Sequence, residues 1–97
     1  MYSNFLLGTL NITKAAHAKL RHHRDPLYFI ALHAINCHGD LTPLERKRNQ
    51  LGMKYHRRIM SRYYVDPLDP SQGRVIVETD DHWEETVVRL EEETCET

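Results

Sequence analysis

The chain has 97 residues and a formal net charge of −1, which describes one small domain, residues 1–97, with the last few residues frayed. No apolar run approaches the roughly 20 residues of a transmembrane helix, and the opening MYSNFLLGTL lacks the basic and apolar regions of a signal peptide. The two cysteines, Cys37 and Cys95, are too few for a disulfide framework. We therefore expect a cytoplasmic protein whose thiols are free.

The first segment, NFLLGTLNI, is short and apolar and predicts a strand or an extended arm. Thr13 follows as a candidate N-cap for a helix over KAAHAKLRHHR. Ala16 and Leu20 have helical spacing in this stretch, and the helix is expected to stop by Asp25.

A second helix is expected to begin where Asp25 caps it and Pro26 occupies the first helical position, at which the missing N–H costs nothing. An apolar stripe at a spacing of 3.6 residues indicates the buried face, and Gly39 is the expected residue just beyond the C-terminus. The stripe consists of Leu27, Ile30, Ala31, Ala34 and Ile35.

The third helix has the clearest start signal in the sequence. Thr42 is the N-cap, Pro43 is the first helical residue and Glu45 the third, which together predict a capping box. The helix should run from Pro43 to about Leu51 or just beyond. Leu44 and Leu51 are expected to face the core, and ERKRNQ to face water.

After Lys54 the sequence pattern changes from helix to strand. Strands are predicted near residues 58–65, 74–79 and 85–91, joined by DPLDPSQG and DDHW. Short connections favour antiparallel neighbours. The predicted fold class is α+β, with a three-stranded antiparallel sheet and a possible fourth edge strand, covered by two or three helices.

No catalytic set emerges from the sequence. The serines lie in no nucleophile elbow, the glycines form no phosphate-binding loop, and Cys37 and His38 point about 100° apart if they lie on one helix. His33 and Cys37 have an i, i+4 spacing that can hold a metal, but no CxxC or HxxxH pair accompanies them. We expect no enzyme, no bound metal and no cofactor.

The small net charge conceals a strong separation of sign. Residues 1–64 contain eleven Lys/Arg and three Asp/Glu, whereas residues 65–97 contain two Arg and eleven Asp/Glu. Such asymmetry within one chain indicates charged partners or an internal dipole.

The basic part contains a cluster of cations with interleaved tyrosines, which suits a phosphate-binding surface and equally suits a solvated helix face that pairs with the acidic part. Residues 25–51 loosely resemble a helix-turn-helix, whose second helix would offer side chains able to read bases. The cluster comprises Arg46, Lys47, Arg48, Lys54, Arg57, Arg58 and Arg62, with Tyr55, Tyr63 and Tyr64.

The acidic part presents carboxylates on a turn and a strand. Alternate strand residues lie about 6.8 Å apart on one face, and each DNA strand carries one phosphate per ~3.4 Å. Carboxylates at such intervals can stand in for phosphates in a site built from Lys and Arg, although a merely soluble turn and terminus would look similar. The candidate partner-binding residues are Asp80, Asp81, Glu84 and Glu85, with Asp66, Asp69, Glu91 and Glu92 in support.

Four stretches resemble a family of short proteins carried on plasmids, integrative elements and prophages: FLLGTLNITKAAHAKL, ALHAINCHGDLTPLERKRNQ, RIMSRYY and RVIVETDDHWEETVVRL. Its members share an opening Leu-Gly, a Gly-Asp before a polar helix, an S-x-Y strand and a final hairpin. This chain departs from that pattern with Leu41 in place of a common Trp, and with His82 and Trp83 in the last turn. In length, composition and expected fold the chain also resembles the type I-F anti-CRISPR proteins.

That second resemblance implies a stoichiometric inhibitor. Some members of the class act as DNA mimics at the duplex-DNA entry site of the surveillance complex, on its large subunit and Cas5-like subunit. The leading hypothesis is therefore a phage- or mobile-element-encoded protein that acts in a bacterial host cell and blocks DNA binding by a CRISPR surveillance complex. The alternatives are a small DNA-binding accessory protein that uses the basic helix at residues 43–54, and an antirestriction protein.

Overall fold

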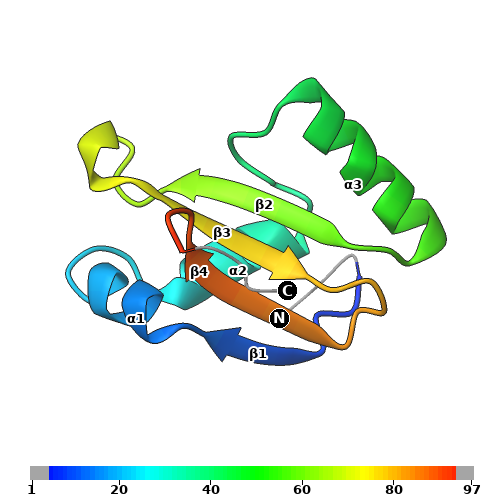
Figure 1. Ribbon diagram of the computed structural model, residues 1–97, viewed down its shortest axis with the longest axis horizontal. Coiled ribbons are helices and arrows are strands. Elements are labelled where there is room, and N and C mark those ends of the chain that lie inside the picture. Colours follow the sequence, from blue (N-terminus) through cyan, green and yellow to red (C-terminus); the bar gives the residue numbers. More distant parts are fainter. Residues whose placement is uncertain (1–4, 94–97) are drawn as a thin grey trace.

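The computed structural model describes residues 5–93, which form an α+β fold with three α-helices and a four-stranded sheet (Figure 1). None of the helices in this range has the length and apolar content needed to cross a membrane. In chain order the elements are β1 (Thr9–Ile12), α1 (Lys14–Leu20), α2 (Pro26–Ala34), α3 (Pro43–Tyr55), β2 (Ile59–Tyr64), a 3₁₀ turn (Pro70–Gln72), β3 (Arg74–Thr79) and β4 (Glu85–Leu90).

The sheet has the strand order β1-β4-β3-β2. The predicted antiparallel meander of β2, β3 and β4 is confirmed, and the three predicted strand ranges agree with the observed ones to within a residue or two. The first segment does add a fourth strand, but β1 pairs with β4 in parallel, with Thr9 opposite Glu85 and Ile12 opposite Val88. The sheet is therefore mixed, and the three helices, β2 and β3 all lie in the chain between its two parallel strands.

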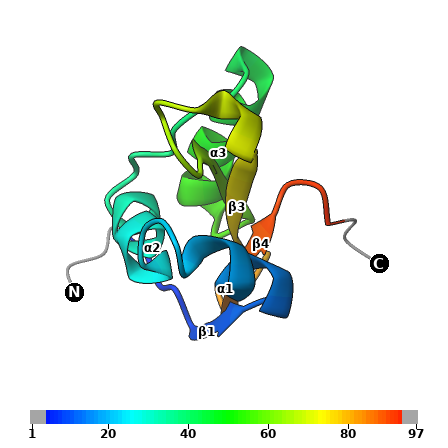
Figure 2. The same cartoon turned by 90° about the vertical axis from the view of Figure 1, so that its left-hand side faces the viewer.

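α1 and α2 cover one face of the sheet and enclose the main core (Figure 2). β2 alternates between buried and less buried residues, as expected for a strand with one face on a core. The core consists of Ala16, Leu20, Phe29, Ile30, Tyr63, Val65, Val75, Val77, Val88 and Leu90.

The structure confirms how α1 and α2 begin and corrects how they end. The side chains of Thr13 and Asp25 cap the two helices as predicted. α1 stops at Leu20, before the predicted end. α2 stops at Ala34 because Asn36 adopts a left-handed backbone conformation, with φ of 62°. Gly39, the predicted residue beyond the helix, lies instead beside β2.

The buried stripe of α2 is also displaced from the predicted one. Leu27 and Ile35, which were expected in the core, are 51% and 50% exposed. Phe29 and His33 take their place, together with Ile30 and Ala34 of the predicted stripe. The face of α2 that packs on the sheet is therefore rotated from the predicted face, and it includes His33.

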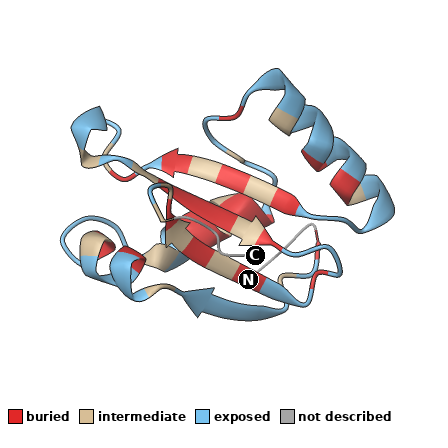
Figure 3. Cartoon of the chain, viewed as in Figure 1, coloured by how far each residue is buried: buried red, intermediate tan, exposed pale blue. Residues whose placement is uncertain are grey.

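α3 begins with the predicted capping box, in which Thr42 and Glu45 exchange two hydrogen bonds of 2.9 and 3.2 Å. The expectation that Leu44 and Leu51 face the core was wrong, since these side chains are 58% and 48% exposed. The residues that α3 buries are Asn49 and Gly52 (Figure 3). The reason is that α3 contacts β2, the last strand of the sheet, where polar backbone groups replace an apolar surface.

Candidate functional site

α3 is attached to the outer edge of β2 by hydrogen bonds to backbone. The Asn49 side chain donates to the Met60 carbonyl at 2.6 Å and accepts from the Met60 N–H at 2.9 Å. Two residues further along β2, Arg62 N–H donates to the His38 carbonyl at 3.0 Å, and Arg62 O accepts from Asp40 N–H at 2.7 Å. These contacts fix α3 and the loop before it, and they leave one hollow on each side of Asn49.

The larger hollow, of about 620 Å³, lies between α3 and the sheet face that α1 and α2 leave uncovered. We call it the arginine groove, because five arginines line it against two carboxylates. α3 contributes Glu45, Arg48 and Asn49, the connection to β2 contributes Arg57 and Arg58, the sheet contributes Met60, Arg62, Ile76 and Arg89, and the β3–β4 turn contributes Asp81.

Ion pairs hold three of the five arginines in position. Arg62 forms two hydrogen bonds of 2.8 Å with Glu45 and contacts Glu91 at 2.9 Å. The hydrogen bond from Arg62 is the main cause that lowers the pKa of Glu45 to about 2, and the Thr42 N–H adds to it. Glu78 pairs with Arg58 and, at 3.6 Å, with Arg89. These charges are partly balanced within the protein.

Arg48 and Arg57 differ from the other groove arginines, since neither forms an ion pair within residues 5–93. Both are exposed. Two cations are therefore available to a ligand in the groove, beside three that are already fixed.

The remaining cations of the predicted basic cluster resemble Arg48 and Arg57. Arg46, Lys47 and Lys54 on α3 are exposed and have no ion pair among the residues that the structure describes. Tyr55 lies beside one of these cations, with Lys54 Nζ 5.3 Å from its ring centroid, whereas Tyr63 does not take part in the basic surface. Tyr63 is a core residue that donates its hydroxyl to the Cys37 carbonyl at 2.6 Å, whereas Tyr55 is 60% exposed.

The eight predicted acidic residues do not form one row. Asp80, Asp81, Glu84 and Glu85 surround the β3–β4 turn, whereas Asp66, Asp69, Glu91 and Glu92 lie beyond the other ends of these strands. β3 has six residues and is therefore about 20 Å long. The two groups are separated by that length of sheet.

The turn group is exposed and firmly held. The Asp80 carboxylate accepts from Glu84 N–H at 2.8 Å, and that of Asp81 from Arg58 N–H at 3.2 Å. Trp83 is buried in the turn, where its indole N–H donates to the Arg57 carbonyl at 2.7 Å. The His56 ring stacks on it with a centroid separation of 4.3 Å. The turn therefore presents four exposed carboxylates, of which those of Asp80 and Asp81 are held by backbone N–H groups and that of Glu85 by the Asn11 side chain.

Most of the second acidic group has structural partners. Asp66 accepts from Leu68 N–H at 2.9 Å, and Asp69 accepts from the backbone and side chain of Ser71. Glu91 pairs with Arg62 at 2.9 Å and with Arg74 at 2.8 Å. Glu92 is exposed. These residues stabilise a loop and a strand end.

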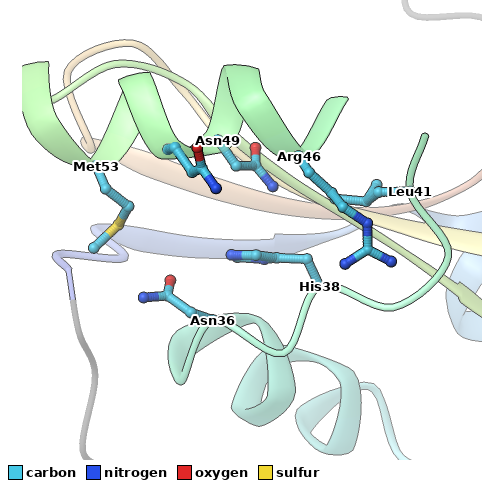
Figure 4. A pocket seen from close by; sticks show the side chains of 7 residues that line it. Asn36, His38, Leu41, Arg46, Asn49 and Met53 are labelled. Carbon is cyan, nitrogen blue, oxygen red and sulfur yellow. The ribbon is translucent and has the colours of Figure 1, made fainter. Parts of the chain in front are cut away.

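The smaller hollow, of about 260 Å³, lies on the other side of Asn49, between α3 and the segment after α2. We call it the His38 pocket. Figure 4 shows Arg46 and Met53 projecting from α3 toward His38 and Asn36. Its lining residues are Asn36, His38, Leu41, Arg46, Asn49, Gln50 and Met53.

A chain of buried polar side chains begins at His38 and was not predicted from the sequence. Ser61 Oγ lies 2.6 Å from Nδ1 of both His38 and His33, and His33 Nε2 lies 2.9 Å from Thr79 Oγ1. Thr79 in turn contacts Thr86 at 2.7 Å. Burial lowers the pKa of His33 to about 3 and that of His38 to about 4, so both rings are neutral near pH 7. The sequence signal that could have revealed it was a set of polar residues, His33, Ser61, Thr79 and Thr86, at positions of a helix and strands that face the core.

The residues considered for metal binding are not arranged as a metal site. Both ring nitrogens of His33 take part in hydrogen bonds, and Cys37 is exposed. Within residues 5–93 no three His, Cys, Asp or Glu side chains converge in a way that could hold an ion. Cys95 lies outside the described residues.

Comparison with protein-family models, with curated proteins and with solved structures gives no match to this chain.

Proposed function

We propose that this protein is a non-catalytic module that binds nucleic acid, with the phosphate backbone held in the arginine groove. The observation that carries the proposal is the pair of exposed arginines, Arg48 and Arg57, which line the groove without an ion-pair partner. Arg62 and Arg89 lie beside them on the sheet. A groove that offers several guanidinium groups suits phosphate, which arginine can bind through two parallel hydrogen bonds.

The surroundings of the groove favour a long anionic ligand over a single ion. α3 has thirteen residues and extends for about 20 Å, and it carries Arg46, Lys47 and Lys54 on its exposed surface. Several phosphates of one strand can be contacted over that length. Phosphate contacts of this kind give affinity and position without reading sequence.

The test is fluorescence anisotropy with labelled duplex and single-stranded oligonucleotides between about 50 and 200 mM salt. The logarithm of the binding constant should fall linearly with the logarithm of the salt concentration. The double variant Arg48→Gln/Arg57→Gln should lower both the affinity and the salt slope, the latter by about two. The matched control is Lys14→Gln/Arg21→Gln, which removes the same charge from the first residue of α1 and from its C-cap. Absence of binding at 50 mM salt, or equal loss in both variants, would refute the proposal.

A second candidate function rests on the β3–β4 turn. Asp80, Asp81, Glu84 and Glu85 are exposed on a turn that buried Trp83 anchors, and hydrogen bonds hold the carboxylates of Asp80, Asp81 and Glu85, so the turn can mimic a row of phosphates. The partner would be the basic DNA-binding surface of a CRISPR surveillance complex, on its large and Cas5-like subunits. Only this turn group supports the mimic, because the other four predicted residues lie beyond the opposite ends of β3 and β4, where Glu91 is already paired with Arg62 and Arg74.

Competition between this protein and labelled target DNA for a purified surveillance complex separates the two functions. Asp80→Asn, Asp81→Asn, Glu84→Gln and Glu85→Gln together remove the turn charge while keeping the hydrogen-bond acceptors. If the turn is the inhibitor, this fourfold variant should lose competition and the Arg48→Gln/Arg57→Gln variant should keep it. Competition by the fourfold variant equal to that of the parent would exclude the mimic.

A further inference from the structure

The His38 pocket is separate from the arginine groove, and its chemistry follows from the direction of the buried hydrogen bonds behind it. The series of hydrogen bonds that begins at His38 ends at the Leu7 carbonyl, which can only accept a hydrogen bond. Thr86 must therefore donate its single hydroxyl hydrogen to Leu7 O, at 2.7 Å. The 2.7 Å contact between Thr79 and Thr86 then requires Thr79 to be the donor.

The same reasoning fixes the protons on both histidines. Because the Thr79 hydrogen is already used, Nε2 of His33 must carry the proton and donate to Thr79 Oγ1 at 2.9 Å. Nδ1 of this neutral ring is then an acceptor for the Ser61 hydroxyl at 2.6 Å. Ser61 has no second hydrogen, so the remaining 2.6 Å contact requires Nδ1 of His38 to donate.

These proton positions determine which hydrogen-bonding group His38 presents to the His38 pocket. A neutral His38 with its proton on Nδ1 has a lone pair on Nε2, on the side of the ring away from Ser61. The ring extends between α3 and Asn36, so this acceptor belongs to the pocket lining (Figure 4). The pocket thus combines one obligate acceptor with one obligate donor, the Arg46 guanidinium.

The other lining residues limit the ligand further. The amide of Asn49 is held in place by its two hydrogen bonds to Met60, which use one of its two N–H groups and one lone pair of its oxygen. Leu41 and Met53 supply apolar surface. The volume of about 260 Å³ is slightly below the range of about 300–1,000 Å³ for drug-sized ligands and suits a single flat ring system with polar edges.

We propose that the His38 pocket binds an unpaired guanine base, with Arg46 donating to O6 and N7 and with His38 Nε2 accepting from the N1–H and N2 amino edge. Guanine carries two neighbouring acceptors, which match a guanidinium, and two neighbouring donors on the adjoining edge. Adenine offers Arg46 only N7 on the corresponding edge, and its amino group occupies the place of O6. The proposal does not depend on phosphate binding in the arginine groove.

The first measurement is ¹⁵N NMR of the imidazole rings in the intact protein. His33 should be protonated on Nε2 and His38 on Nδ1. The opposite tautomer of His38 would overturn the proposal, because Nε2 would then be a donor and could not accept from the guanine N1–H and N2 edge.

The second measurement is a titration with guanosine, adenosine, cytidine and uridine, followed through the ring signals of His38. These nucleosides carry no phosphate, so the result is independent of the groove. Guanosine should bind at least about fivefold more tightly than the others, the lower end of the discrimination expected from one bidentate arginine contact. Absence of guanosine binding at millimolar concentration, or equal binding of adenosine, would overturn the proposal.

Variants test the two contacts separately. His38→Asn places an amide nitrogen at the same number of bonds from Cα as Nδ1, so it can keep the donor to Ser61 while it removes Nε2. Arg46→Gln replaces the forked guanidinium on α3 by a shorter neutral amide at an exposed position, and Arg48→Gln is the matched control on the groove side of the same helix. Both pocket variants should weaken guanosine binding roughly tenfold, and the control should remain within twofold. Unchanged binding by Arg46→Gln would refute the proposal even if His38→Asn fails to fold.

Discussion

Asn49 and Met60 are joined by two hydrogen bonds, of 2.6 and 2.9 Å, that reproduce the pairing a neighbouring strand would give. One helical side chain thereby satisfies both outward backbone groups of an edge-strand residue. Unpaired edges are where sheets recruit other chains, so this contact protects β2 as well as holding α3.

Replacing Asn49→Leu should destabilise the protein strongly. The change fills a similar volume but leaves Met60 N–H and C=O without partners beneath α3, at a cost of about 2–4 kcal/mol in the free energy of unfolding. Urea denaturation measures the difference, and Lys47→Ala on the exposed side of the same helix is the control, expected within ±0.5 kcal/mol. A loss below about 1 kcal/mol would show that the edge is satisfied in another way.

Gly52→Ala should also destabilise, against the helix propensity of alanine. Alanine is favoured over glycine within a helix by about 1 kcal/mol. At this position a Cβ would lie 2.4 Å from Arg58 O and 2.8 Å from Ile59 Cδ1, so α3 would have to move away from β2. We expect a net loss of about 1–3 kcal/mol by urea denaturation. Leu51→Ala, at an exposed neighbour, serves as control, and a stabilised Gly52→Ala variant would contradict the close packing.

The two buried histidines predict how stability depends on pH. Burial lowers the pKa of His33 to about 3 and that of His38 to about 4, against about 6.5 in an unfolded chain. Between pH 6.5 and 4 the unfolded chain binds protons that the folded protein does not. The free energy of unfolding should therefore fall as the pH falls through this range, by at most about 1.4 kcal/mol per histidine per pH unit.

Urea titrations at several pH values between 4 and 7 measure this dependence. His38→Asn removes one of the two groups and should make the slope shallower. A slope that is identical in the parent and in His38→Asn would show that His38 is protonated in the folded state.

Ser61→Ala should uncouple the two histidines. The substitution leaves Nδ1 of His33 and of His38 without their shared partner, at a cost of about 1–3 kcal/mol for the buried His33 acceptor. It also removes the constraint on the His38 tautomer, so the imidazole ¹⁵N spectrum of His38 should change. Ser71→Ala, in the exposed loop before β3, is the comparison. If the variant kept both the stability and the spectrum of the parent, Ser61 would not link the two histidines by hydrogen bonds.

Local signals in the sequence predicted much of the fold. The capping box of Thr42 and Glu45 and the cap at Asp25 depend on neighbouring residues only, and both are present. The change from a helical to a strand pattern of apolar residues after Lys54 is also a local signal, and it located three strands. The parallel pairing of β1 was missed, because it depends on a strand far away in the chain.

The sites were harder to predict, because they depend on what each element contacts. Leu44 and Leu51 suggested a core-facing helix, but α3 packs on backbone, where Asn49 and Gly52 fit better. The acidic residues look continuous in sequence, yet strand length divides them between two ends of the sheet. Ser61, Thr79 and Thr86 resemble ordinary strand residues until the hairpin brings them to His33.

The parallel pairing of β1 has a consequence for how the protein forms during translation. The contact between Leu7 and Thr86 joins residues 79 positions apart, and in residues 5–93 the only strand that pairs with β1 is β4. At a synthesis rate of 5–20 residues per second, β1 waits about 4–16 seconds on the ribosome before that strand emerges. During this time its exposed Leu10 and Ile12 are available to chaperones, and completion of the sheet must follow the release of β4 from the exit tunnel.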